Sequence, residues 1–260
     1  MTQTVADIQK RLRSADEEEF AVLERSLIAD TRKGVQQALK SARHRLDEEK
    51  AERDRICGLF SFERSLIDGA CAVGLDEVGR GPLAGPLTVA AVVFDDSVTY
   101  LEGLNDSKQV PEAKRASIAQ EIKKVARAWA VYSIEPASID DHGMAACLRK
   151  AFSEVVKQIE AQGIIPERIL LDGNPLHFDS RETNIVKGDA KCASIAAASL
   201  IAKTTRDAMM VEYDKEYPGY DFASSKGYGS AAHRKAIEEK GLTPIHRKSF
   251  CTNFMQERLF

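Results

Sequence analysis

The chain has 260 residues, of which 43% are hydrophobic and 30% charged, and its formal net charge at pH 7 is -3. This length is enough to bury a hydrophobic core without disulfides or structural metals, and the slight negative charge excludes a protein that is basic over its whole surface. Five scattered cysteines form no CxxC pair and no zinc spacing, which favours reduced thiols. The chain shows no apolar signal segment and no run long enough to cross a membrane, so we expect a cytoplasmic protein.

Residues 1–70 contain no proline and mix acidic with basic side chains. Apolar residues recur at Phe20, Leu23 and Leu27, and again at Val35 and Leu39, which is helical spacing. We expect two or three amphipathic helices, arranged as a helical hairpin, that extend the main domain. A nucleic-acid-binding module is the alternative, because several basic residues could contact phosphate; these are Lys33, Lys40, Arg43, His44 and Arg45.

The remaining chain alternates strand and helix patterns. Strands are predicted at 72–75, 87–94, 128–134, 169–171 and 183–186, where short apolar segments end in turn residues. Helices are predicted at 111–127, 138–162, 192–214 and 231–240, the last ending at Gly241. The order of these elements predicts an α/β fold with a mixed sheet flanked by helices.

Acidic residues follow three of the apolar segments. Asp76 and Glu77 come directly after 71–75, Asp172 follows 168–171, and Asp189 lies in a turn before the alanine-rich helix. Carboxylate oxygens are the ligands that hard divalent cations prefer. A surface turn with a salt bridge would explain any one of these motifs, but three acidic turns beside apolar elements favour one shared site.

Six motifs in order carry a resemblance to a known family: DEVGRGPLAGP, LNDSK, LLDGN, KGDAK with SIAAASLIAKTTRD, KGYG and HRKSF. Together they resemble the bacterial type 2 ribonucleases H, the ribonuclease HII family, over residues 71–250. The resemblance implies a ribonuclease H-like fold with a five-stranded mixed sheet. It divides the chain into a helical N-terminal extension (1–70), a catalytic domain (71–210) and a C-terminal helical subdomain with a tail (211–260).

The resemblance also implies a metal site formed by Asp76, Glu77, Asp172 and Asp189. Two Mg²⁺ or Mn²⁺ ions held there would clamp the attacking and leaving oxygens of a phosphodiester, and the sequence does not distinguish the two metals. An acidic residue before a helix is also a common N-cap, so Asp189 has a purely structural alternative.

Substrate contacts follow from the same resemblance. The turn Gly79, Arg80 and Gly81 is implied to read the 2′-hydroxyl of a ribonucleotide, and Tyr228 to contact the sugar of the following deoxyribonucleotide. Five further residues are candidate phosphate contacts: Asn105, Ser107, Lys108, Lys203 and Arg206. We expect four other residues to have structural roles. Asp106 should orient its loop, Asp207 should form an intrahelical ion pair, and His246 and Arg247 should pack in the interior.

The implied activity is that of an endoribonuclease. It would cut the RNA strand of RNA–DNA hybrids and nick duplex DNA 5′ of an embedded ribonucleotide, leaving a 3′-hydroxyl and a 5′-phosphate. One alternative is the ribonuclease HIII family, which cleaves hybrids, typically carries threonine where Arg80 stands and has an N-terminal sheet domain. Another is a hybrid-binding module without activity, against which the four mutually repelling acids argue. Departures from the family pattern occur at Gln109, Val110 and Gly143, and none of them touches the acids.

The last five residues have the form Gln-x-x-Leu-Phe. This resembles the short peptide by which bacterial replication proteins dock on the sliding clamp, through Gln256, Leu259 and Phe260. Packing of the same apolar residues on the last helix is the alternative. Nothing in the sequence demands more than a monomer, and we expect the core to fold without residues 1–65 because every motif lies beyond them.

Overall fold

The computed structural model describes residues 4–252. The chain divides into two compact units, Met1–Cys57 and Gly58–Phe260, called here the N-terminal unit and the sheet unit. The boundary falls inside a long helix, α3 (Lys33–Ile67), whose last turns therefore belong to the sheet unit. Among the described residues no helix is both long and apolar enough to span a membrane.

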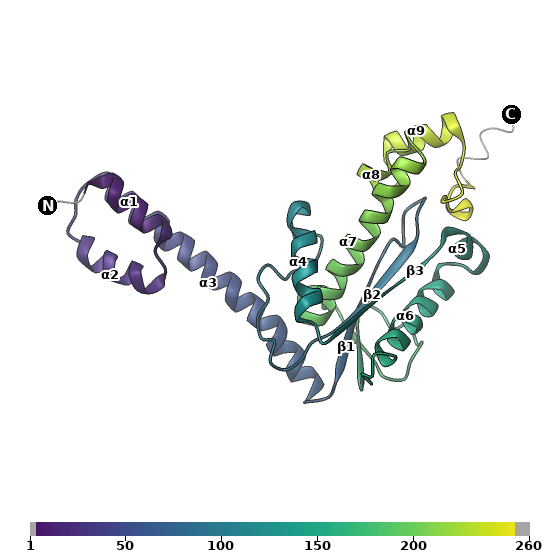
Figure 1. Ribbon diagram of the computed structural model, residues 1–260, viewed down its shortest axis with the longest axis horizontal. Helices are drawn as coiled ribbons and strands as arrows, with labels where there is room; N and C mark the ends of the chain where they lie inside the picture. The colour runs from purple at the N-terminus through teal and green to yellow at the C-terminus, as the bar shows by residue number, and fades with distance from the viewer. Residues whose placement is uncertain (1–3, 253–260) are drawn as a thin grey trace. The chain divides into compact units, whose positions relative to one another are not determined.

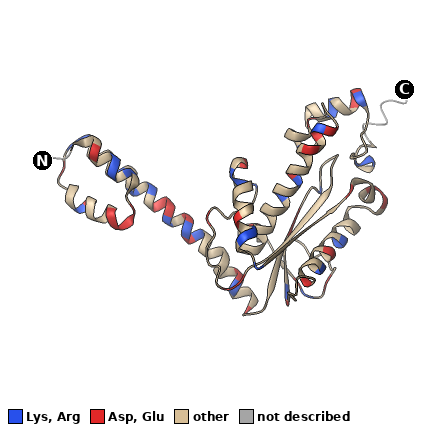
Figure 2. Cartoon of the chain, viewed as in Figure 1, with Lys and Arg blue, Asp and Glu red and all other residues tan. Residues whose placement is uncertain are grey.

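The N-terminal unit is built from helices alone. Two short helices, α1 (Val5–Ser14) and α2 (Glu17–Leu27), precede α3. Thr4 and Asp16 cap them by accepting hydrogen bonds from backbone N–H groups three residues further on, as good N-caps do. The apolar positions that share a helix face form one separate core, and acidic and basic residues alternate on the outside (Figure 2). The predicted amphipathic helices are confirmed.

The sheet unit contains the predicted five-stranded mixed sheet. Its strands are β1 (Ala72–Val78), β2 (Leu87–Val93), β3 (Ala128–Ile134), β4 (Arg168–Asp172) and β5 (Glu182–Ile185). They lie in the order β3-β2-β1-β4-β5, with β1 antiparallel to β2 and parallel to β4 (Figure 1). The prediction ended the first strand at residue 75, but β1 continues to Val78, so Asp76 and Glu77 lie within the strand.

Helices cover the sheet and form the C-terminal subdomain. Their bounds are α4 (Glu112–Val125), α5 (Pro136–His142), α6 (Met144–Glu160), α7 (Ala193–Glu216), α8 (Phe222–Ser225) and α9 (Ala231–Lys240). Two short 3-10 turns are η1 (Gly188–Ala190) and η2 (Lys248–Phe250). The single helix predicted over 138–162 is wrong, because Gly143 has a φ of 77° and ends α5 before α6 begins. A positive φ is incompatible with a continuing helix, and glycine adopts it readily.

Two hydrophobic layers hold the sheet between its helices. On one face Val73, Leu75, Ile169 and Leu171 pack against α6. On the other face Ala72 and Leu170 join the start of α7, in agreement with the view in which α7 and α6 lie on opposite sides of the strands (Figure 1). Because side chains alternate along a strand, the residues that share a face with Leu170 and Ala72 include Asp76 and Asp172.

The approach of α7 to β1 depends on small residues. A Cβ atom added at Gly74 would lie 2.2 Å from the Ser194 Oγ atom and 2.4 Å from the Ser194 carbonyl carbon. The first turns of α7 are buried on all sides, from Ala193 to Ala202. This close packing explains the alanine-rich sequence and brings the residues along α7 next to the end of β1.

The expectation that the core folds without residues 1–65 stays a prediction, but one side chain of that segment contacts the sheet unit directly. Glu63, in the last turns of α3, is 7% exposed. Its carboxyl group accepts a hydrogen bond from the Ser194 N–H at 2.8 Å and one from the Cys192 thiol at 3.1 Å. The Cys192 side chain does not cap α7, so Glu63 supplies the cap from another helix. Removal of residues 1–65 therefore cuts into the sheet unit.

Candidate active site

The first two acids of the site lie on adjacent strands, Asp76 near the end of β1 and Asp172 at the end of β4. Leu75 is opposite Leu171 in the parallel pair β1–β4, so Asp76 and Asp172 occupy the next position of each strand on the face that α7 covers. Burial raises the pKa of Asp76 well above its ordinary value, and repulsion from Glu77 and Asp172 raises it further. A carboxyl group that resists ionisation in this way is one that a cation would stabilise.

Glu77 follows directly along β1 and belongs to the same group of charges. Burial raises its pKa, and Asp172 adds to the effect. The Arg80 guanidinium opposes both, with its Nη1 atom 3.3 Å from the Glu77 Oε1 atom. Arg80 is exposed, so this ion pair leaves the guanidinium accessible to a ligand.

Asp189 reaches the group from η1, the turn that leads into α7. Its pKa is raised by burial first and then by repulsion from Asp172 and Asp106. The Asp172 carboxyl group also accepts a hydrogen bond of 2.7 Å from the Gly188 N–H, and this bond ties the turn to the end of β4. The alternative assignment of Asp189 as a simple N-cap is not supported, since the residue before α7 is Cys192.

The four carboxyl groups thus form one electrostatically linked set of oxygen donors. Such a set fits Mg²⁺ or Mn²⁺, both of which take oxygen ligands. Within residues 4–252 no three carboxyl, imidazole or thiol groups already enclose a single point as a metal cage. The metal role of these residues is therefore inferred from their convergence and mutual repulsion.

The LNDSK loop lies against the same carboxyl groups. The Lys108 Nζ atom is 3.6 Å from Asp189 and 3.9 Å from Asp106, on an exposed side chain. Asp106 accepts a hydrogen bond from the Lys108 N–H at 3.0 Å, which confirms its orienting role. Ser107 was predicted to contact phosphate, but it is 5% exposed and its hydroxyl accepts a hydrogen bond of 2.7 Å from Ser199 in α7. Its side chain therefore anchors the loop, and the phosphate assignment is corrected.

The Gly-Arg-Gly turn is fixed from the protein interior. Gly79 has a φ of 93°, and a Cβ atom there would lie 2.6 Å from the Pro86 carbonyl oxygen. The fully buried Arg247 donates hydrogen bonds to the carbonyl oxygens of Gly79 at 2.6 Å and Arg80 at 3.1 Å. The structural role predicted for Arg247 is confirmed, and its specific task is to hold this turn.

Tyr228 lies beside the turn. A Cβ atom added at Gly81 would be 3.8 Å from the Tyr228 Cε1 atom, and the tyrosine is 47% exposed. The KGYG loop that carries it binds the turn segment through hydrogen bonds from the Leu83 and Ala84 N–H groups to the Gly227 carbonyl oxygen. The structure thus brings an aromatic ring and the Gly-Arg-Gly turn to one place.

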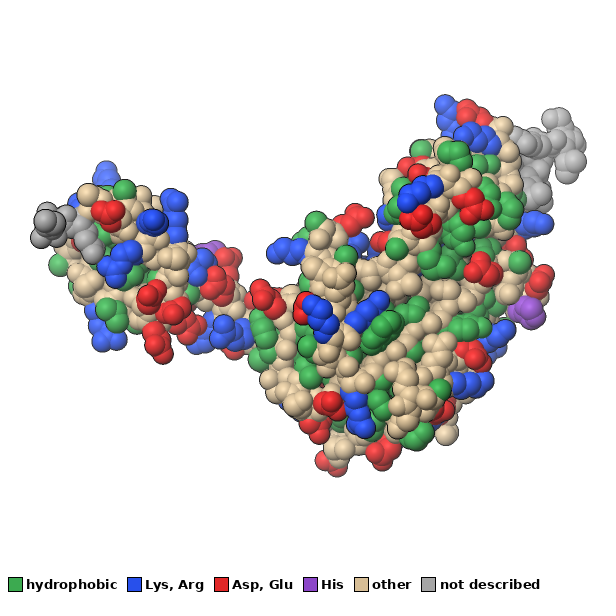
Figure 3. Space-filling model, viewed as in Figure 1, with side chains coloured by type: hydrophobic (Ala, Val, Ile, Leu, Met, Phe, Trp, Pro, Cys, Tyr) green, Lys and Arg blue, Asp and Glu red, His purple; other side chains and the backbone are tan. Residues whose placement is uncertain are grey.

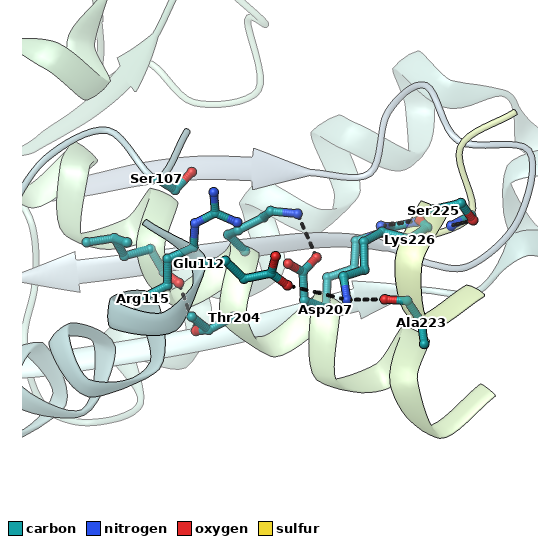
Figure 4. Close-up of polar contacts among 12 residues, drawn as sticks. Ser107, Glu112, Arg115, Thr204, Asp207, Ala223, Ser225 and Lys226 are labelled. Atoms are coloured by element: carbon teal, nitrogen blue, oxygen red, sulfur yellow. Dashed lines mark hydrogen bonds and ion pairs between the residues drawn. The ribbon is translucent and has the colours of Figure 1, made fainter. Parts of the chain in front are cut away.

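Lys226 at the start of that loop joins it to two helices. Its Nζ atom donates a hydrogen bond to the Ala223 carbonyl oxygen and lies 3.8 Å from the Glu112 carboxylate at the start of α4 (Figure 4). Figure 4 also places Thr204 and Asp207 of α7 nearby. The loop is therefore tied to both α8 and α4.

Two predicted phosphate contacts on α7 differ in their outcome. Arg206 is fully buried and donates hydrogen bonds to the carbonyl oxygens of Pro86, Ala84 and Lys226, so it cannot reach a phosphate and the prediction is wrong. Lys203 is partly exposed and pairs with Asp207 at 2.7 Å. This pair confirms the intrahelical ion pair expected for Asp207.

The face of the sheet unit seen in Figure 3 carries no continuous basic surface. The face seen in Figure 3 intersperses acidic and basic side chains, and neither sign covers it. Asn105, which is partly buried, uses its side-chain oxygen to accept a hydrogen bond from the Asp106 N–H.

Comparisons with known proteins agree with this geometry. Residues 73–253 match the family model described as Ribonuclease HII, and residues 4–67 match that described as Ribonuclease HII N-terminal domain. The crystal structure of ribonuclease H2 from Pyrococcus horikoshii OT3 superposes with a TM-score of 0.62 at 25% sequence identity, covering 72% of this chain and 98% of its own.

Two further structures are similar. Ribonuclease HII from Archaeoglobus fulgidus, in a structure of its complex with PCNA, has a TM-score of 0.57 at 25% identity and covers 68% of this chain and 93% of its own. Bst-RNase HIII in complex with Mn²⁺ has a TM-score of 0.59 at 19% identity, with 76% and 73% covered. At that identity the second likeness concerns the fold alone.

Replacement of Asp76 by Asn should abolish turnover yet stabilise the metal-free protein. We expect turnover to fall about a hundredfold or more, the scale for removal of a group that organises transition-state charge. Because the folded-state pKa of Asp76 is raised, the wild type loses stability as pH rises from the unfolded pKa through the folded one. In chelator, the gain in melting temperature should therefore be larger at pH 8 than at pH 5.

Asp141→Asn is the matched control, because Asp141 is an exposed aspartate at the end of α5. This variant should keep both activity and stability. Near-normal turnover of Asp76→Asn with Mg²⁺ would remove Asp76 from the metal site. A melting temperature that falls at both pH values would show that the buried Asp76 carboxylate does not destabilise the folded protein.

Proposed function

This chain belongs to the ribonuclease HII family, and we propose that it nicks duplex DNA on the 5′ side of an embedded ribonucleotide. Family membership makes it a ribonuclease H, a hydrolase that acts on RNA–DNA hybrids. The observation that carries the finer proposal is that Tyr228 lies beside the Gly-Arg-Gly turn, whose Arg80 pairs with Glu77. The products would carry a 3′-hydroxyl and a 5′-phosphate.

In this proposal Asp76, Glu77, Asp172 and Asp189 hold two Mg²⁺ or Mn²⁺ ions. Ions bound there would supply Lewis acidity that activates water and neutralises the charge on the phosphodiester. Asp172 accepts a hydrogen bond from the Gly188 N–H and so orients η1. This bond supports the proposal that Asp172 and Asp189 bind metal together. Lys108, exposed beside Asp189, would contact a phosphate and fix the register of the strand.

The orientation of the turn supports recognition of a 2′-hydroxyl. Arg247 binds the carbonyl oxygens of Gly79 and Arg80 from the interior, and the described peptide bonds are trans. The N–H of a trans peptide unit points away from its carbonyl oxygen. The N–H groups of Arg80 and Gly81 therefore point away from Arg247, on residues that are exposed, and can donate to a 2′-hydroxyl that DNA lacks.

Tyr228 would complete the recognition of the junction. Its exposed ring beside Gly81 can stack on the sugar or base that follows the ribonucleotide. A ribonuclease HIII-like enzyme restricted to hybrids remains the alternative, but the N-terminal unit contains helices alone among residues 4–57, whereas that family typically has a sheet domain. Arginine at position 80 argues in the same direction.

Cleavage of a duplex with one ribonucleotide, beside an all-RNA strand in a hybrid, tests the proposal. We expect the wild type to cut both with divalent metal. Tyr228→Ala should lower kcat/KM for the single ribonucleotide about tenfold, since stacking on an aromatic ring contributes roughly 1–3 kcal/mol, and affect the hybrid less.

Tyr100→Ala is the control, because Tyr100 is a similarly exposed tyrosine at 41%. A wild type that cuts the hybrid but leaves the single ribonucleotide intact would favour the hybrid-only alternative. Equal losses on both substrates in Tyr228→Ala would reject a junction-specific role for the ring.

We also propose that the C-terminal tail, residues 256–260, docks on the replication sliding clamp. Gln256, Leu259 and Phe260 lie outside the described residues, so it rests on the sequence pattern, in which two apolar side chains can enter a pocket and an amide can fix orientation. The thiols support a cytoplasmic location for such a partnership, because no disulfide joins the five cysteines.

A calorimetric titration of the clamp tests the docking. Wild type should bind, and Leu259→Ala/Phe260→Ala should not, while cleavage stays unchanged. Lack of binding by the wild type at high micromolar clamp would reject the proposal.

A further inference from the structure

A pair of buried histidines lies behind the loop that carries Tyr228. His233 of α9 is 0% exposed and His246 of the HRKSF segment is 2% exposed. The His233 Nδ1 atom is 2.8 Å from the Tyr228 carbonyl oxygen, and its Nε2 atom is 3.1 Å from the Nε2 atom of His246. The two rings thus connect the tyrosine to the C-terminal segment.

The hydrogen-bond partners determine where the protons are. The His246 Nδ1 atom lies 2.9 Å from the Thr243 backbone nitrogen, which can only donate, so this Nδ1 atom is an acceptor. A neutral imidazole carries one proton, which His246 must therefore hold on Nε2. That proton points at the His233 Nε2 atom, and His233 in turn holds its proton on Nδ1 and donates it to the Tyr228 carbonyl oxygen.

The surroundings keep both rings neutral, as this arrangement requires. The rings of Tyr220 and Phe222 pack on them, with centroid distances of 5.1–5.6 Å. Burial lowers the pKa of His246 to about 4, with His233 as a second cause, and burial also lowers the pKa of His233. Asp221 and the Tyr228 carbonyl act in the opposite direction on His233, yet burial prevails.

The loop needs such a support because its backbone is strained. Lys226 has a φ of 52° and Gly227 one of 82°, and the left-handed conformation is unfavourable for lysine. On one side the loop is held by the hydrogen bonds between the Gly227 carbonyl oxygen and the turn segment. On the other side the Tyr228 carbonyl oxygen accepts two hydrogen bonds. One comes from the N–H of Ser230, the N-cap of α9, at 2.8 Å, and the other comes from His233 within α9.

We propose that His233, with its proton fixed on Nδ1 by His246, is a positioning residue that sets the Tyr228 ring for the ribonucleotide junction. This inference rests on the proposed function of Tyr228. His233 itself touches no substrate; it acts by fixing the carbonyl group of the residue that does. Loss of its Nδ1 donor should therefore impair junction cleavage more than hybrid cleavage.

Two substitutions separate the donor from the bulk of the side chain. In His233→Asn the amide nitrogen can occupy the place of Nδ1 and still donate to Tyr228, whereas in His233→Gln the amide reaches the place of Nε2 and leaves the carbonyl without this donor. We expect His233→Gln to lower the ratio of kcat/KM for the single ribonucleotide to that for the hybrid about threefold to tenfold, the scale of one hydrogen bond. His233→Asn should stay within about twofold of the wild type.

Nitrogen-15 NMR of the wild type provides a second readout that needs no variant. At neutral pH, His233 should carry its proton on Nδ1 and His246 on Nε2. Protonation of both rings on Nε2, or a charged His233, would overturn the inference even where His233→Gln fails to fold.

The outcomes also separate this inference from the proposed function. A lowered ratio in Tyr228→Ala with an unchanged ratio in His233→Gln would overturn only the role of His233. An unchanged ratio in Tyr228→Ala would reject the role of Tyr228 and, with it, this inference. Equal losses in His233→Asn and His233→Gln would show that packing, not the donated proton, holds the loop.

Discussion

The whole site depends on the register between two parallel strands. Because Leu75 is opposite Leu171, Asp76 and Asp172 occupy the next position of adjacent strands on one face, and the mutual repulsion of their carboxyl groups is imposed by the sheet. The rest of the site is built on this placement. Asp172 holds η1 and thereby Asp189, while Gly74 lets α7 approach β1 closely enough for Ser199 to hold the LNDSK loop.

Two buried arginines hold the Gly-Arg-Gly turn and the segment after it. Arg206 and Arg247 are fully buried, and their hydrogen-bond acceptors are backbone carbonyl oxygens of 79–86 and Lys226. Burial lowers the pKa of both, that of Arg247 to about 10, with repulsion from Arg206 as its second cause. Arginine side chains stay protonated in proteins. Arg206 and Arg247 therefore fix the Gly-Arg-Gly turn and the segment that follows it from the protein interior.

Much of the fold followed from local patterns. The strands that carry Asp76 and Asp172 could be predicted from their apolar segments, although β1 continues past the predicted end to Val78, and the ordered motifs identified the candidate acids. Residues whose role depends on distant partners could not be found. Arg206 looked like a phosphate contact because a helix sequence does not show which face is covered, although the small residues before it indicated burial on all sides. Glu63 and His233 had no signal, since Ser194 lies 131 residues from Glu63 and His246 lies 13 residues from His233 along the chain, and packing brings each pair together.

The break at Gly143 has the same explanation. Apolar spacing continued across it, and only the backbone conformation reveals the end of α5. Asp140 at that end accepts hydrogen bonds from the Lys248 and Ser249 N–H groups, so the break lets α5 bind the segment that contains His246 and Arg247. Local sequence could not show that α5 must end here, because the reason is a contact with a segment more than a hundred residues away.

Titration of the free protein with Mn²⁺, followed by electron paramagnetic resonance, tests most directly whether the four carboxyl groups form one divalent-cation site. The wild type and Glu121→Gln, which changes an exposed carboxylate of α4, should bind Mn²⁺ equally and release protons, because carboxyl groups with raised pKa values must ionise to bind. Asp172→Asn should weaken binding roughly tenfold or more. Equal affinity and equal proton release in Asp172→Asn and the wild type would contradict the account.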